Sequence, residues 1–162
     1  VLSAQLAGLP RDHDVYGLVH GDFEVDNIAW HDGLATAFDW DEAERSWFAA
    51  DIAYAVRDLL PDPGALLDAM PPLVGSFLAG YGSVRPDADV DTRQLVLFSA
   101  VNAARSLARL APVLAEDPSA GASLAAAASD DPAPSLRQRL ERYADRQRTL
   151  VLELGGLLAT RS

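Results

Sequence analysis

The chain has 162 residues, of which 49% are hydrophobic and 23% charged, enough apolar side chains for a packed core in one domain or part of a larger protein. Its formal net charge of -11 argues against nucleic acid and anionic membranes as partners, because both attract basic surfaces. There is no cysteine and no apolar run long enough to span a membrane, so disulfides and thiol chemistry are excluded and a cytoplasmic location is expected.

The first part of the chain predicts one helix end and a few short strands. Residues 2–8 have the pattern of a helix end, and Val15–His20 that of a short apolar strand. Asn27–His31 and Leu34–Trp40 form the arms of a predicted hairpin, because the Asp-Gly pair between them favours a tight turn. A polar loop, His20–Asp26, therefore connects a strand to a hairpin.

The rest of the chain predicts helices. Apolar residues recur at helical spacing, and prolines mark where the helices stop. The predicted helices run from Phe48 to the proline at position 61, over 63–81 with a break at Pro71-Pro72, over Asp91–Leu114, and from a cap at Ser135 to about Leu158. The low-complexity segment 116–134 is predicted to be a mobile loop. The predicted fold class is α+β and mostly α-helical, with too few strands for a doubly wound sheet.

Three side chains with oxygen donors lie where the predicted strands begin or end. Asp22 is in the polar loop, Asn27 opens the first hairpin arm, and Asp39 lies near the end of the second. If the strands are adjacent, the three converge at one end of the hairpin. Carboxylate and amide oxygens suit a Mg²⁺ ion that keeps several waters and binds substrate phosphates. A further carboxylate nearby can accept a hydroxyl proton.

This spacing resembles that of phosphoryl-transfer enzymes. Protein kinases carry H-R-D-x-x-x-x-N, followed after a hairpin by D-F-G. Here His20-Gly21-Asp22 precedes Asn27 by the same interval, and Asp39 stands where the second motif is expected. The stretches "HGDFEVDN", "FDWDEA" and "WFAADIAYAVRDLL" resemble the aminoglycoside phosphotransferase and choline kinase family over Leu18–Leu60. The resemblance implies that residues 1–162 form the C-terminal lobe of a protein-kinase-like fold, with a small catalytic-loop hairpin.

The resemblance also implies a role for each matching residue. Asp22 corresponds to the catalytic base that deprotonates the acceptor hydroxyl, and His20 to a histidine that positions the loop. Asn27 and Asp39 correspond to Mg²⁺ ligands, through which the phosphates of ATP or GTP are bound. Asp51 corresponds to a carboxylate that accepts hydrogen bonds from the loop backbone and so fixes the loop before substrate arrives.

Other polar residues near the loop leave alternatives open. Asp41 and Glu42 are candidate acceptor-binding residues for a cationic small molecule, with a solvated turn as an equal alternative. We expect Glu24 and Asp26 to be solvated loop acids. Elsewhere we expect ordinary surface and packing roles, namely surface positions for His13 and His31, packing for Trp30, Trp40 and Trp47, and surface ion pairs for Arg105 and Arg109.

Nucleotide binding by this family needs parts that the sequence does not contain. The nucleotide lobe carries a glycine-rich loop and a strand lysine, whereas all 13 basic residues here are arginine. We therefore expect the N-terminal lobe to be absent from this chain, and the chain alone to be inactive. The implied function is ATP- or GTP-dependent phosphorylation of a small-molecule hydroxyl, on an aminoglycoside, choline or ethanolamine, homoserine or a sugar. A degenerate lobe that binds without transfer is the alternative, and an interaction protein with an incidental acidic loop is less favoured.

Overall fold

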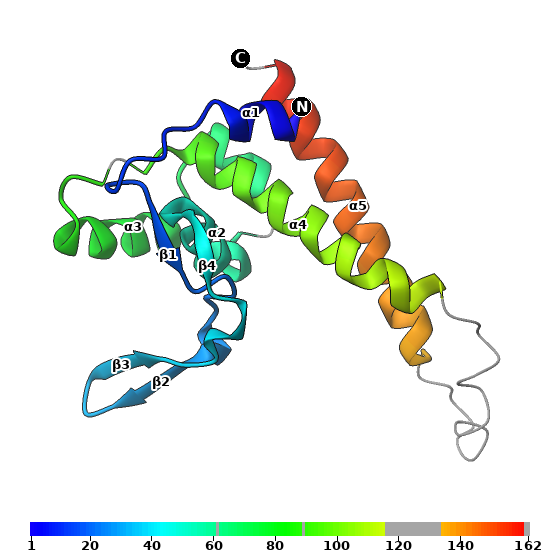
Figure 1. Cartoon of the computed structure of the whole chain (residues 1–162), viewed down its shortest axis with the longest axis horizontal. Coiled ribbons are helices and arrows are strands. Elements are labelled where there is room, and N and C mark those ends of the chain that lie inside the picture. The colour runs from blue at the N-terminus through cyan, green and yellow to red at the C-terminus, as the bar shows by residue number, and fades with distance from the viewer. Residues whose placement is uncertain (61, 89, 116–133, 161–162) are drawn as a thin grey trace.

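The computed structural model describes residues 1–60, 62–88, 90–115 and 134–160. Within these residues the chain folds into five α-helices, with two small antiparallel sheets beside them (Figure 1). The helices are α1 (Leu2–Ala7), α2 (Phe48–Val56), α3 (Pro72–Val84), α4 (Thr92–Ala115) and α5 (Leu136–Thr160). The fold is therefore of the α+β class and mostly helical, as predicted. None of the described helices is both long and apolar enough to cross a membrane.

The core lies where α2, α4 and α5 meet. α4 and α5 run side by side, and α2 packs against α4 (Figure 1). Leu95 and Phe98 of α4, Leu154 of α5 and Val56 of α2 are each at most 2% exposed. Several buried alanines on α2 take little space, so its backbone packs closely on α4. This helical body forms the rigid base on which the strands and their connecting loops are mounted.

The predicted helices are confirmed, with ends that differ by a few residues. The predicted break at Pro71-Pro72 separates the short 3-10 helix η4 (Pro63–Leu67) from α3, in whose first turn Pro72 needs no amide donor. Ser135 caps α5 as predicted, because the Gln138 N–H donates to Ser135 Oγ at 3.2 Å and the Ser135 N–H donates to Gln138 Oε1 at 2.9 Å. Of the predicted mobile loop 116–134, residues 116–133 lie outside the described residues.

The strands form two separate pairs. β1 (Tyr16–Val19) pairs antiparallel with β4 (Glu44–Trp47), with Val19 opposite Glu44 in the register. β2 (Ile28–His31) pairs antiparallel with β3 (Leu34–Ala37) as the predicted hairpin. The turn of that hairpin has positive φ at both Asp32 and Gly33, 48° and 77°, which explains the Asp-Gly pair. Figure 1 shows this hairpin extending away from the helical body.

Two parts of the strand prediction were wrong. The second hairpin arm was expected to reach Trp40, but β3 ends at Ala37, and Asp39 takes a left-handed backbone with φ 62° that ends the extended chain. The short 3-10 helix η2 (Trp40–Glu42) follows. β1 pairs with β4, a strand that the sequence analysis did not predict because Glu44-Arg45 interrupts any apolar alternation.

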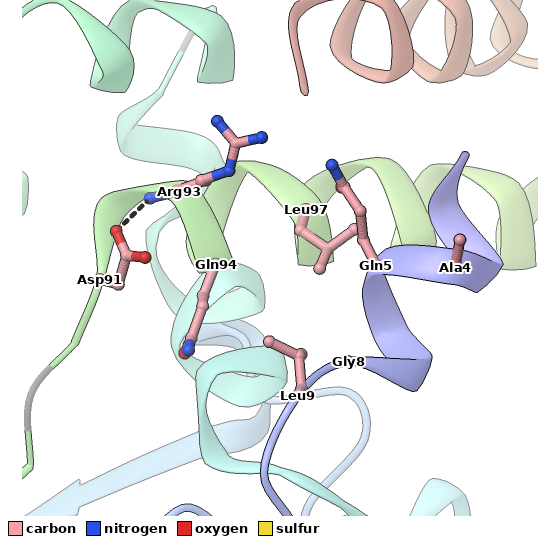
Figure 2. A pocket seen from close by; sticks show the side chains of 8 residues that line it. All are labelled: Ala4, Gln5, Gly8, Leu9, Asp91, Arg93, Gln94 and Leu97. Atoms are coloured by element: carbon pink, nitrogen blue, oxygen red, sulfur yellow. Dashed lines mark hydrogen bonds between the residues drawn. The ribbon is translucent and has the colours of Figure 1, made fainter. Parts of the chain in front are cut away.

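A pocket of about 320 Å³ lies between α1 and the first turn of α4 (Figure 2). The Asp91 carboxylate there accepts a hydrogen bond from the Arg93 backbone N–H at 2.8 Å. Gln5 Nε2 donates to the Leu158 carbonyl at 3.1 Å, which ties α1 to α5. None of the residues that the sequence marks as site candidates lines this pocket.

Candidate functional site

The loop that follows β1 is held at its start by one carboxylate. The backbone N–H of His20 donates to Asp51 Oδ2 at 2.6 Å, and the backbone N–H of Gly21 donates to Asp51 Oδ1 at 2.9 Å. Asp51 lies in the first turn of α2, where the helix dipole favours a negative side chain. Both carboxylate oxygens are thus used to fix two successive amides, which sets the direction in which the chain leaves β1.

Gly21 is required by its backbone and by its surroundings. Its φ of +83° is a left-handed conformation that side chains disfavour. A Cβ added at this position would lie 2.2 Å from the Glu42 carbonyl oxygen, far inside van der Waals contact. The glycine between His20 and Asp22 therefore lets the loop and the segment after Asp39 pass backbone against backbone.

His20 is a buried packing and hydrogen-bonding residue. It is 1% exposed, and its ring lies 4.6 Å from the Trp40 ring and 5.7 Å from the Phe23 ring. Its Nε2 lies 2.8 Å from the Phe38 carbonyl oxygen, which assigns the proton to Nε2 because a carbonyl can only accept. Its Nδ1 has no partner among the described residues. The ring thus links the loop after β1 to the chain after β3.

Asp22 and Asn27 contact one another across the loop. Asn27 Nδ2 donates to the Asp22 carbonyl at 2.8 Å and lies 3.3 Å from Asp22 Oδ2. Asn27 is 8% exposed and lies at the end of the 3-10 helix η1 (Val25–Asn27), whereas Asp22 is half-buried. Because the amide nitrogen is used by Asp22, the side-chain oxygen of Asn27 is the atom left for a cation.

Asp39 is brought to the same end of the hairpin as Asn27. The Phe38 N–H donates to the Asn27 carbonyl at 3.1 Å, which extends the β2–β3 pairing by one residue and leaves Asp39 next in the chain. Asp39 is exposed, and its left-handed backbone directs it out of the strand. The structure therefore gathers Asp22, Asn27 and Asp39 into one region.

The donor set at this hairpin end fits a partly hydrated cation. No group of three or more His, Cys, Asp or Glu side chains that would enclose a metal occurs in the part of the chain that the structure describes. One amide oxygen and one or two carboxylates are instead what Mg²⁺ uses when waters and substrate phosphates complete its octahedron. The residues that could hold such an ion are Asn27 and Asp39, with Asp22 beside them.

Comparison with known proteins identifies the family of this chain. The model of a family described as "Phosphotransferase enzyme family" (APH) matches residues 1–95, more than half of the chain. The chain belongs to the phosphotransferase enzyme family. The matched region includes the His20–Asn27 loop, the hairpin and Asp51, so the resemblance that the sequence showed at these residues is confirmed as membership of the family.

Two individual relatives cover shorter stretches. Amicoumacin kinase of Bacillus subtilis (strain 168) is 34% identical over 80 residues, which make up 49% of this chain and 24% of that protein. Acyl-CoA dehydrogenase family member 11 of Gallus gallus is 40% identical over 52 residues, 30% of this chain and 7% of that protein. The matches thus span about a quarter or less of the relatives' own length.

The acids that follow Asp39 in the chain differ in their exposure and pairing. Asp41 is exposed, as either prediction for it requires. Glu42 is paired with Arg109 of α4, and Glu44 is paired with Arg105, so the expected surface ion pairs of both arginines are confirmed. The Glu42 carboxylate is therefore already matched by a positive charge, which weakens its pull on a cationic ligand.

The prediction for Glu24 was wrong, while that for Asp26 is confirmed. Asp26 is exposed at the loop surface. Glu24 is only 22% exposed and forms an ion pair with Arg57, which lies in the 3-10 helix η3 (Arg57–Leu59) just after α2. The pairing joins residues far apart in sequence, so no local pattern marks it.

The aromatic and histidine predictions are partly confirmed. His13 and His31 are surface residues, each with a side chain 92% exposed. Trp47 is buried and packs against Phe98. Trp30 does not pack, because it is 68% exposed on the hairpin. The packing prediction fails there because, among the described residues, nothing covers this part of β2.

One residue near the loop was missed altogether. Tyr54 lies one helical turn after Asp51 on α2 and is 8% exposed. Burial, and after it the negative charge of Asp22, raise the pKa of the Tyr54 phenol above its ordinary value, while Arg109 and Arg105 act in the opposite sense. The signal available in the sequence was the spacing of Asp51 and Tyr54, which places both on the side of α2 that meets the loop.

A second pocket, of about 280 Å³, borders the loop from another direction. Its lining is mostly apolar and aromatic, and comprises Leu18, His20, Phe23, Trp40, Phe48, Asp51, Ile52, Phe77 and Tyr81. The charged member of that lining, Asp51, already uses both carboxylate oxygens on the loop amides. This pocket is suited to apolar contacts and not to phosphate groups.

Proposed function

We propose that the chain is the C-terminal lobe of a protein-kinase-like phosphotransferase that transfers the terminal phosphoryl group of ATP or GTP to a hydroxyl of a small molecule. The observation that carries the proposal is the loop after β1. Asp51 fixes its first two amides, Asp22 and Asn27 contact one another, and Asp39 follows Phe38, whose N–H donates to the Asn27 carbonyl. Phosphoryl transfer depends mainly on positioning and electrostatic stabilisation, and such a fixed set of oxygen donors supplies both.

In this proposal Asp22 is the catalytic base. Its carboxylate accepts the proton of the acceptor hydroxyl as that oxygen attacks the terminal phosphorus, and the bond from phosphorus to the bridging oxygen of the nucleotide breaks. Asn27 Nδ2 donates to the Asp22 carbonyl at 2.8 Å and to Asp22 Oδ2 at 3.3 Å, which orients the carboxylate and assigns Oδ1 to the acceptor. His20 takes no part in proton transfer, because its ring is buried between Trp40 and Phe23.

Asn27 and Asp39 are the residues that would hold Mg²⁺. Their oxygens are hard donors, and the Phe38–Asn27 hydrogen bond at 3.1 Å keeps them at one end of the hairpin. When bound, the ion neutralises the charge of the nucleotide phosphates. The left-handed backbone of Asp39, with φ 62°, is the kind of strained conformation that clusters at functional sites.

The nucleotide lobe belongs outside this chain in the proposal. That lobe contributes a lysine that holds the nucleotide phosphates in kinases, and this chain has only arginine among its basic residues. We therefore expect no phosphoryl transfer by residues 1–162 alone. The activity therefore has to be measured on the full-length protein.

The proposed acceptor is a hydroxylated small molecule. The candidates are an aminoglycoside, choline or ethanolamine, homoserine and a sugar, and the relative named amicoumacin kinase adds amicoumacin to them. Asp41 is the exposed acid that would attract a cationic acceptor, whereas Glu42 is paired with Arg109. A panel of these compounds, screened by thermal shift with nucleotide and Mg²⁺, would identify the acceptor because a ligand that binds the folded protein raises its melting temperature.

The decisive test compares two aspartates of the same loop. Asp22→Asn in the full-length protein should lower kcat by about 10²- to 10⁴-fold, the usual contribution of a general base. Asp26→Asn, a matched change at an exposed loop position, should leave kcat within about twofold. Asp39→Asn should raise the Mg²⁺ concentration needed for half-maximal rate. If Asp22→Asn retained its turnover, Asp22 would not be the base. If the wild-type protein bound ligands but showed no turnover, the result would favour a non-catalytic binding module.

A further inference from the structure

The loop that carries Asp22 and Asn27 is tied to the body by a second charged contact. The carboxylate of Glu24, halfway along that loop, pairs with the guanidinium of Arg57, directly after the last residue of α2. Glu24 is 22% exposed and Arg57 44%, so the pair is partly withdrawn from water. Such a pair contributes little to global stability, so its effect should be local to the loop that it holds.

Glu24 also anchors Asn27 through its backbone. The Asn27 N–H donates to the Glu24 carbonyl at 3.0 Å, which closes the turn η1. Asn27 in turn donates through Nδ2 to the Asp22 carbonyl at 2.8 Å. A movement of Glu24 would therefore shift Asn27, the proposed metal ligand, and through Asn27 it would shift Asp22, the proposed base.

Arg57 is itself held by packing. Its Cζ lies 5.1 Å from the centre of the Tyr54 ring, a cation–π contact between the residue that follows α2 and the last turn of that helix. Tyr54 is 8% exposed, so its ring gives Arg57 a fixed packing surface. The contacts therefore run in a chain from Asp22 through Asn27, Glu24 and Arg57 to Tyr54.

We propose that Glu24 and Arg57 are positioning residues for phosphoryl transfer, forming a clamp that fixes the second half of the loop against the end of α2. Asp51, in the first turn of α2, fixes the first half through the amides of His20 and Gly21. The two ends of one rigid helix thus hold the two halves of the loop. This inference rests on the proposed function, because it assigns the clamp a role in the same transfer.

The clamp predicts a change in rate without a matching change in binding or stability. In the full-length protein, Glu24→Gln and Arg57→Gln should each lower kcat by about 10- to 100-fold, since small displacements of a catalytic group are costly. The nucleotide KM should stay within about twofold, and the melting temperature should hardly move. The double variant should be no slower than either single variant, because each substitution removes the same contact between Glu24 and Arg57. Arg57→Lys, which keeps the charge, should recover most of the rate.

A control and a second readout keep the test decisive. Glu141→Gln breaks a comparable pair with Arg137 on α5, where Glu141 is 50% exposed, and should leave kcat unchanged. Hydrogen–deuterium exchange should quicken at residues 22–27 in the Gln variants and stay unchanged at 18–21, which Asp51 holds. Unchanged kcat, or single effects that add in the double variant, would overturn the clamp. If the wild-type protein shows no turnover, the proposed function fails, and unchanged exchange at 22–27 would then reject the clamp separately.

Discussion

The carboxylate of Asp51 offers the sharpest measure of how firmly the loop is fixed. It accepts the His20 N–H at 2.6 Å and the Gly21 N–H at 2.9 Å, and both bonds involve an ionised acceptor. A hydrogen bond to a charged group contributes about 1.5–3 kcal/mol, so Asp51→Ala should lower the free energy of opening this segment by about 3–6 kcal/mol. Since about 1.4 kcal/mol is a factor of ten, the two amides should exchange at least about 100-fold faster.

Hydrogen–deuterium exchange of the full-length protein measures this opening directly. Asp51→Asn should also speed the exchange of these amides, but by less than Asp51→Ala. Its one remaining oxygen can accept only one of the two N–H groups, while its NH₂ group faces the other. Asp145→Ala is the control, since that carboxylate is 72% exposed on α5 and pairs only locally with Arg148. If the His20 and Gly21 amides exchanged at the wild-type rate in Asp51→Ala, the carboxylate would not be what orders the loop.

Two further substitutions test the loop and the helix beside it. Gly21→Ala should lower the unfolding free energy by at least about 1 kcal/mol more than Gly33→Ala, because both glycines have positive φ but only Gly21 would bring a Cβ to 2.2 Å from a carbonyl oxygen; equal losses in urea unfolding would contradict the close approach. Tyr54, whose folded-state pKa is raised, should contribute stability that is complete below its ordinary value of 10.0 and is lost as pH rises from there through the folded pKa. Between about pH 9 and about pH 11 the unfolding free energy of Tyr54→Phe should therefore fall less than that of the wild type. An identical fall would contradict a raised pKa of the Tyr54 phenol.

The parts of this fold that depend on local pattern were predictable. The Asp-Gly turn, the Pro71-Pro72 break and the cap at Ser135 each follow from the conformational preference of one or two residues. The region of Asp22 and Asn27 was predictable in the same way, since the spacing itself brings them together around one turn.

The rest depends on contacts between distant segments. β4 is a strand because β1 lies beside it, not because Glu44-Arg45 favours extension. Glu24 looked like a solvated acid because Arg57, its partner, is remote in sequence. In both cases a charged residue that reads locally as surface is placed by tertiary structure.

The pairing of β1 with β4 has a consequence for how this family can vary. Val19 and Glu44 face one another in the ladder, so everything between them leaves and re-enters the helical body at adjacent points. The hairpin tip within that excursion is open, since a Cβ added at Gly33 would meet nothing within 4 Å. Insertions or exchanges at the tip therefore change the outer reach of the excursion without altering where it is rooted. The chemistry of the loop and the shape of its distal end can evolve, or be engineered, as separate traits.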